Sequence, residues 1–176
     1  DDREVEPPGA AKSISRETTF GKDTRDRSLL AATLRYLGER VGNTLRQQGK
    51  LARCVTLKLR YADFTTITRR HTLSQTTDSD QAIFETGARR LKSELSLGKQ
   101  PVRLIGIGVS NLVEGGRQPD MLDSKTQRLE QLNRAIDRIR NKYGFTAIQT
   151  GRTLLLKDIF PENEGGYTLH TPSLSR

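Results

Sequence analysis

The run Ala52-Arg-Cys-Val-Thr-Leu-Lys-Leu-Arg-Tyr61 ends in strict alternation of apolar and polar residues. Val55, Leu57, Leu59 and Tyr61 point to one side, and Thr56, Lys58 and Arg60 point to the other. A period of two is typical of a strand with one buried and one solvated face. Ala62-Asp-Phe64 then forms a turn, and residues 65–74 return with Ile67 and Leu73 toward the core. We expect a hairpin whose outer face is cationic.

Two helices and two further strands flank this hairpin. Apolar residues three or four positions apart predict helices over residues 26–48 and 79–97. Residues 12–20 and 102–113 read as strands. The order β-α-β-β-α-β predicts an α+β fold, in which a four-stranded sheet carries both helices on one face and leaves the other face open.

Beyond residue 113 the pattern changes. We expect a loop over residues 114–123 and a third helix over 124–143 with the apolar stripe Leu129, Leu132, Ile136, Ile139 and Tyr143. Strand-like pieces follow at 145–148 and 153–156. The predicted organisation is therefore a linker (1–11), a binding domain (12–113), a loop (114–123), a helical extension (124–160) and a flexible tail (161–176).

The composition favours a polyanionic partner. The chain has 176 residues, a net charge of +9 and a pI of about 10.0, which is typical of nucleic-acid-binding domains. Cys54 is the only cysteine, so no internal disulfide can form, and its apolar surroundings predict a buried, inert thiol. No apolar run approaches the ~20 residues that span a bilayer. The chain begins Asp-Asp-Arg-Glu without an initiator methionine, and we interpret it as a piece of a longer protein or as a trimmed chain.

Catalytic and metal-binding patterns are missing from the sequence. His71 and His170 stand far apart, which disfavours zinc. No nucleophile elbow or phosphate-binding loop occurs. Asp78-Ser-Asp80 begins a predicted helix and is interpreted as a helix cap rather than a metal site. We expect no cofactor and no independent enzymatic activity from this chain.

The hairpin is the candidate binding surface. Residues 51–75 carry Arg53, Lys58, Arg60, Arg69 and Arg70 against Asp63 alone, a local balance of +4. Threonines interleave with these cations, and hydroxyls with Arg and Lys are the usual phosphate contacts. An ordinary solvated strand face would carry the same residues. The outer face lacks the interleaved aromatic rings that stack unpaired bases, which favours a double-stranded over a single-stranded nucleic acid. An unrelated RNA-binding α/β domain, the further alternative, would also carry exposed aromatic residues on its central strands.

Three segments together resemble the little finger domain of Y-family translesion DNA polymerases. They are Lys12-Ser-Ile-Ser-Arg-Glu-Thr-Thr-Phe20, the segment from Val55 to Leu73, and Val102-Arg-Leu-Ile-Gly-Ile-Gly-Val-Ser-Asn-Leu112. The similar branch is that of bacterial DNA polymerase IV (DinB/ImpB/MucB/SamB-like). The helix from Arg128 to Gly144 resembles the C-terminal extension often found in this branch.

The resemblance implies a sheet that lies in the major groove of primer–template DNA and holds both backbones. By position, it implies backbone contacts from Ser13, Ser15, Arg16, Thr18 or Thr19, Thr66, Thr68, Arg69 and Arg70, and close approach at Gly106 and Gly108, beside Lys58 and Arg60 of the outer face. Arg16 shares the parity of the core residue Ile14, so either the strand bulges or Arg16 lies at its edge.

The resemblance also implies a parent protein. We expect a DNA-directed DNA polymerase of the bacterial cytoplasm that uses Mg²⁺, with its catalytic core and a sliding clamp as partners. The palm carboxylates, fingers and thumb lie outside this sequence. Residues 171–176 lack a clamp peptide of the Gln-Leu-x-Leu-Phe kind, whereas Leu154-Leu-Leu-Lys-Asp-Ile-Phe160 is a conceivable internal site. The alternative function is a protein-interaction module that docks on a clamp or on the polymerase core.

Overall fold

The computed structural model describes residues 12–98, 100–115 and 124–170. Six elements follow in the predicted order: β1 (Ser13–Thr24), α1 (Arg27–Gln47), β2 (Lys50–Tyr61), β3 (Thr66–Thr77), α2 (Asp80–Leu97) and β4 (Val102–Glu114). The helices begin where short polar side chains cap them. Asp26 accepts hydrogen bonds from the backbone N–H groups of Ser28 and Leu29, and Ser79 accepts one from Ala82.

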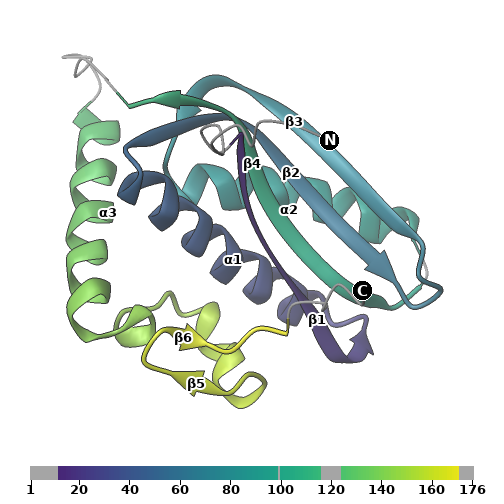
Figure 1. Ribbon diagram of the computed structural model, residues 1–176. Helices are drawn as coiled ribbons and strands as arrows, with labels where there is room; N and C mark the ends of the chain where they lie inside the picture. Colours follow the sequence, from purple (N-terminus) through teal and green to yellow (C-terminus); the bar gives the residue numbers. More distant parts are fainter. Residues whose placement is uncertain (1–11, 99, 116–123, 171–176) are drawn as a thin grey trace, which may run out of the picture.

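The four strands form one antiparallel sheet in the order β1-β4-β2-β3. Figure 1 shows α1 and α2 on the same face of this sheet. The core lies between the two layers and includes Leu34, Leu37, Leu57, Ile105 and Ile107, all of which are buried. The predicted α+β fold with one open sheet face is therefore confirmed.

The long helix α3 (Ser124–Tyr143) lies beside α1 and matches the predicted range (Figure 1). Ion pairs hold it there. Arg46 of α1 binds Asp137 of α3 through Nε–Oδ2 at 2.6 Å and binds Asp80 of α2 at 2.8 Å. Arg140 of α3 binds Glu39 of α1 at 2.6 Å, and both side chains are buried. Ser79, rather than either flanking aspartate, caps α2, and Asp80 instead belongs to this buried network.

The segment after α3 differs from the expected strands. Residues 145–148 and 153–156 contain 3₁₀ turns, η1 (Phe145–Ala147) and η2 (Thr153–Asp158). Thr153 and Leu156 are buried while Leu154 and Leu155 are exposed. This spacing of three matches a 3₁₀ turn and not the alternation of a strand. Leu156 is fully buried in the core that α1 supplies.

Residues 161–170 are ordered against the domain, in contrast to the expected flexible tail. They form the small hairpin of β5 (Glu162–Asn163) and β6 (Gly166–Tyr167). The backbone N–H of Tyr167 donates to the Tyr36 hydroxyl at 2.8 Å, and the N–H of Thr19 donates to the carbonyl of His170 at 2.8 Å. The remainder of the expected tail, residues 171–176, lies outside the described residues, as do the expected linker 1–11 and most of the expected loop 114–123. Within the described ranges, none of the helices combines the length and the apolar character that crossing a bilayer requires.

Candidate nucleic-acid interface

A shallow hollow lies on the open face of the sheet and crosses all four strands. We call it the open-face surface. The lining residues with the open-face parity are Ser13, Ser15, Glu17, Thr56, Lys58, Thr68, Arg70, Gly106, Gly108 and Ser110, and the lining also includes Ile14, Arg16, Ile107 and Val109. The strand register explains this gathering. Thr56 lies between Arg70 and Gly108, and Lys58 lies between Thr68 and Gly106, so strands distant in sequence present one continuous polar surface.

Each cation of this region is oriented by a side chain on another strand of the sheet. Lys58 Nζ forms an ion pair with Glu17 Oε2 at 2.8 Å. Arg60 Nε donates to Thr66 Oγ1 at 2.9 Å, just beyond the hollow. Arg70 donates to Ser110 Oγ at 3.4 Å. These contacts leave Arg60 and Arg70 without a carboxylate among the described ion-pair partners, so their charge is available to an anion.

Two glycines make the floor of the hollow. A Cβ at Gly106 would stand 2.8 Å from the Cβ of Glu17, and one at Gly108 would stand 3.0 Å from the Cβ of Ser15. Both distances are shorter than ordinary van der Waals contact. The side chains of β1 can therefore lean over β4 only because these two positions lack side chains. The floor is bare backbone, as the glycines on one face of the predicted strand indicate.

Three predicted contact residues have the parity of the helix-facing side of the sheet. Thr18 is fully buried, and its hydroxyl lies 3.5 Å from the carbonyl of His170. Arg69 lies opposite Leu57, on the helix side, and binds Glu94 of α2 at 2.6 Å. The reason is the alternation of side chains along a strand, which turns neighbours to opposite faces. Thr19 has the open-face parity and lies opposite Leu104.

Arg16 is the third of these residues. It lies opposite Ile107 on β4, and the β1–β4 register is regular from Ser13 to Thr19. The strand therefore does not bulge at this position. Arg16 has the parity of the buried face but is exposed, because β1 is an edge strand. Arg16 therefore lies at the edge of the sheet, and not at a bulge in β1.

The sequence-based list omitted Glu17, Thr56 and Ser110, although all three line the open-face surface. Thr56 has the parity of Lys58 on one strand, and Glu17 has the parity of Ser15 on another. Strand parity was therefore a usable signal for Thr56 and Glu17.

Cys54 is buried with a free thiol. The described residues contain no group of three or more His, Cys, Asp or Glu side chains that could hold a metal ion.

Comparison with known proteins places this sheet in a family. The model of the impB/mucB/samB family C-terminal domain matches residues 11–121, more than half of the chain. The chain belongs to this family. The resemblance drawn from its three strand motifs is thus confirmed. The matched range of the impB/mucB/samB C-terminal domain includes the whole four-stranded sheet and both of its helices.

Relatives of this impB/mucB/samB domain extend the match to the C-terminal part of the chain. A protein of Dehalococcoides mccartyi strain CBDB1, named DNA polymerase IV, is 48% identical over 160 residues, which are 91% of this chain and 41% of that protein. DNA polymerase IV of Desulfatibacillum aliphaticivorans is 37% identical over 167 residues, which are 93% of this chain and 41% of the relative. The chain thus spans about two fifths of the length of these relatives.

Solved structures show the same fold. The insertion ternary complex of Dbh DNA polymerase superposes with a TM-score of 0.53 and 17% identity, over 58% of this chain and 29% of that chain. A Y-family DNA polymerase chimera of Dbh and Dpo4 gives a TM-score of 0.53 and 18% identity, over 60% of this chain and 30% of that chain. At these identities the match concerns the fold of the impB/mucB/samB domain alone.

Proposed function

We propose that this domain binds duplex DNA through the phosphates, with the open-face surface as its contact area. One observation carries the proposal. Lys58, Arg60 and Arg70 lie with the hydroxyls of Ser13, Ser15, Thr56, Thr66 and Thr68 around a floor of glycine backbone. Cations, hydroxyls and accessible backbone are the groups that contact phosphate oxygens in protein–DNA complexes. The proposed contact set also keeps Thr19 and Arg16, which is exposed at the sheet edge and lines the hollow. It leaves out Thr18, which is buried, and Arg69, which binds Glu94 on the helix side.

The shape and chemistry of the surface favour a duplex held by its backbones. The residues that line the hollow, all within the described part of the chain, include no aromatic side chain. Single-strand binders depend on such rings to stack successive bases. The aromatic residues of this domain occupy other places: Phe20 and Phe145 are buried, and Phe64 is exposed at the β2–β3 turn under Arg103. A face of this kind would hold DNA without reading its sequence.

The parent protein that we propose is a DNA-directed DNA polymerase of the lesion-bypass type. Its relatives carry the name DNA polymerase IV, and this chain corresponds to about two fifths of their length. The catalytic core, its Mg²⁺ and the bacterial cytoplasm belong to that proposal. In it, the present domain holds the primer–template duplex while the chemistry takes place in the other part of the protein.

Fluorescence anisotropy with a labelled DNA duplex over a salt series tests the proposal. Affinity should fall steeply as salt rises, because bound phosphates release counterions. Arg70→Ala and Lys58→Ala should each weaken binding to all sequences alike and reduce the salt slope by about one. Arg69→Ala is the matched control, because Arg69 neighbours Arg70 in sequence but binds Glu94 on the helix side. Failure to bind at low salt, or binding that ignores salt, would contradict the proposal.

A second function has its own support. Leu154, Leu155 and Ile159 are 55%, 51% and 47% exposed on and beside η2, next to the buried Leu156 and Phe160. Exposed apolar side chains in a cluster are typical of protein-interaction sites. This segment could dock the domain on a sliding clamp or on the polymerase core. Co-elution with a purified bacterial clamp, lost in Leu155→Ser and retained in Arg70→Ala, would establish this docking independently of DNA binding.

A further inference from the structure

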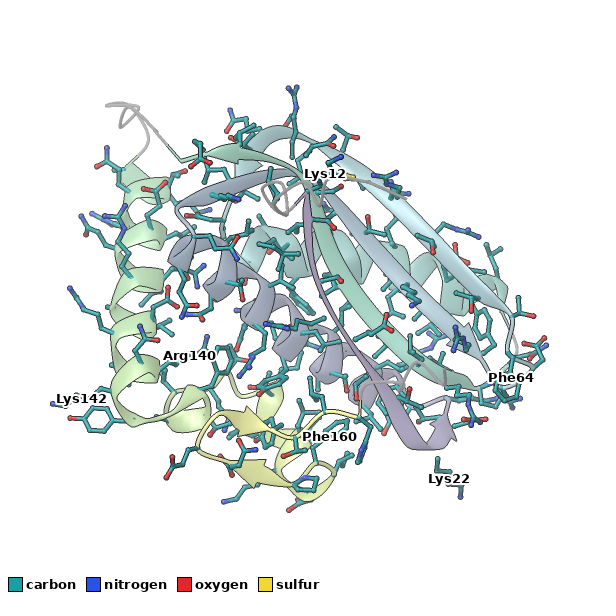
Figure 2. All side chains as sticks on the ribbon, in the orientation of Figure 1. Lys12, Lys22, Phe64, Arg140, Lys142 and Phe160 are labelled. Atoms are coloured by element: carbon teal, nitrogen blue, oxygen red, sulfur yellow. The ribbon has the colours of Figure 1, made fainter. Side chains whose placement is uncertain are left out.

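Helix α3 turns a polar side, and not its apolar stripe, toward the rest of the molecule. Asp137 accepts from Arg46 and from Asn43, whose Nδ2 lies 2.9 Å from Oδ1. Arg140 is buried, binds Glu39 and donates to the carbonyl of Ile148 at 3.1 Å. Figure 2 shows Arg140 on the side of α3 that faces α1, and Lys142 on the outer side. Asp137 and Arg140, which are three residues apart on the helix, therefore attach α3 to α1 through ion pairs and hydrogen bonds.

The apolar stripe of α3 is left partly uncovered. Leu129 is 37% exposed, Leu132 53%, Ile139 38% and Tyr143 66%. With Ile136 these residues repeat at spacings of three and four, which places them along one line of the helix. The line is about 21 Å long at 1.5 Å per residue. A regular stripe of this length on a polar helix is the arrangement by which helices recognise one another.

A hollow at the N-terminal end of the stripe adds a second feature. It lies between α3 and the region where β3 leads into α2, and its lining combines Leu73, Ala82 and Leu129 with nine polar residues, among them Asp78 and Glu130. The surface is therefore an apolar ridge with a mostly polar hollow at one end, and not a flat patch.

The charges beside the stripe specify the partner. Lys125 and Arg128 precede Leu129 and Leu132 by four positions, and Lys142 follows Ile139 by three, so all three cations lie next to apolar members of the line. In α3, all of which the structure describes, five cations are exposed and neither acidic residue is. A second copy of this chain would bring the same cations to the contact, which like-charge repulsion disfavours.

We propose that this side of α3 is a docking surface for an acidic amphipathic helix of another protein. The apolar face of such a helix would cover the line from Leu129 to Tyr143. Its flanking Asp or Glu side chains would meet Arg128 and Lys142. The site is separate from the open-face surface, so its test does not depend on DNA binding.

A designed peptide probes the surface directly. It is a fluorescein-labelled helix of about 18 residues, long enough to cover four turns, with leucines at spacings of three and four and glutamates beside them. We expect saturable binding to the full chain by anisotropy. Leu132→Ser should weaken it about tenfold, the loss expected of a central apolar contact. Arg128→Glu should weaken it about fivefold through charge reversal at the rim.

Matched controls distinguish binding at this site from non-specific hydrophobic or electrostatic binding. Leu97→Ser removes a leucine that is 80% exposed on α2 and should leave peptide binding unchanged. Arg134→Glu reverses an exposed charge two positions from Leu132 and Ile136, hence on the far side of α3, and should also have no effect. Circular dichroism and duplex binding report that each variant is folded.

Three outcomes would overturn the proposal. Equal binding of a peptide that has lysines in place of the glutamates would show that the partner helix need not be acidic. Concentration-dependent dimerisation by sedimentation, lost in Leu132→Ser, would make a second copy the occupant. Binding to anionic phospholipid vesicles but not to the peptide, lost in the same variant, would make the helix a membrane contact.

Discussion

Glu17 places a negative charge in the middle of a surface that is otherwise cationic. Its Oε2 lies 2.8 Å from Lys58 Nζ, above Gly106. Both side chains are about one-third exposed, so water screens the pair and its contribution to stability is small. The functional consequence is larger, because a phosphate that approaches Lys58 must compete with this carboxylate. Glu17 therefore acts as an internal counterion on the proposed DNA surface.

Glu17→Gln should strengthen duplex binding. The amide keeps the size of the side chain and removes the competing charge, so Lys58 becomes available to a phosphate. The salt slope should become steeper, because Lys58 then meets its phosphate without a competing carboxylate. Anisotropy titrations of the wild type and the variant over the same salt series measure both quantities.

The control for this substitution is Glu94→Gln, which removes the carboxylate that binds Arg69 on the helix side. Its affinity and slope should match the wild type. An unchanged slope in Glu17→Gln would mean that Lys58 keeps its contact without the charge, or does not meet DNA at all.

Strand parity decides which individual residues the sequence can place. Thr18 and Thr19 are chemically alike and adjacent, yet one is buried beside His170 and the other has the open-face parity. Applied throughout, the same rule separates Arg69 from Arg70 and adds Glu17 to the surface. Ser110 is harder to predict, because its relation to Arg70 depends on the order in which β4 and β3 flank β2.

At the scale of elements, α1, α2 and α3 meet through buried charge. Burial raises the pKa of Asp80 to about 6, and the attraction of Arg46 only partly opposes this effect. Partial burial also acts to raise the pKa of Asp137, but hydrogen bonds from Arg46 and Asn43 outweigh it and hold that pKa below its usual value. Gly42 permits the arrangement, since a side chain there would collide with the Asp80 carboxylate.

These two aspartates should affect stability with opposite dependence on pH. The folded pKa of Asp80 lies above its unfolded value of 3.8, so its contribution is complete below about pH 4 and is lost as the pH rises through 6. Asp80→Asn should therefore cost more unfolding free energy at pH 4 than at pH 7, by ~2 kcal/mol. Asp137→Asn should cost more at pH 7, because a lowered pKa stabilises the fold above the unfolded value.

Urea unfolding of the wild type and both variants at the two pH values measures these differences, and each variant serves as the control for the other. The same sign in both variants would show that the network titrates as one unit, contrary to this assignment.

The long elements, in which the hydrophobic pattern repeats several times, were predictable, and the short ones were not. The helices α1, α2 and α3 follow apolar stripes, and the four long strands follow alternation or turn signals. The run Thr153-Leu-Leu-Leu156 gave no such signal, because one 3₁₀ turn has the length of a short strand. The stripe of α3 identified a helix but not its orientation, which depends on partners contributed by Arg46 and Glu39 of α1.

At the scale of the whole molecule, the C-terminal hairpin joins the two ends of the described chain. Tyr167 is buried, and its ring centroid lies 5.1 Å from that of Tyr36. Gly166 has a φ of +108°, and a side chain there would collide with the Tyr36 hydroxyl. From this anchor the chain continues to His170, whose carbonyl accepts the Thr19 N–H of β1. The hairpin thus supports the free edge of the sheet that carries Ser13, Ser15 and Glu17.

Removal of this anchor should loosen β1 at a distance. Tyr167→Ala deletes a buried aromatic side chain and should cost about 3 kcal/mol of unfolding free energy. Hydrogen exchange at the Thr19 amide should accelerate more than exchange in the central strand β2, since the Thr19 N–H donates to the His170 carbonyl. Leu155→Ala, at a side chain that is 51% exposed, should change neither quantity. Uniform acceleration across the sheet would instead show that the hairpin supports global stability without a specific effect on the edge strand.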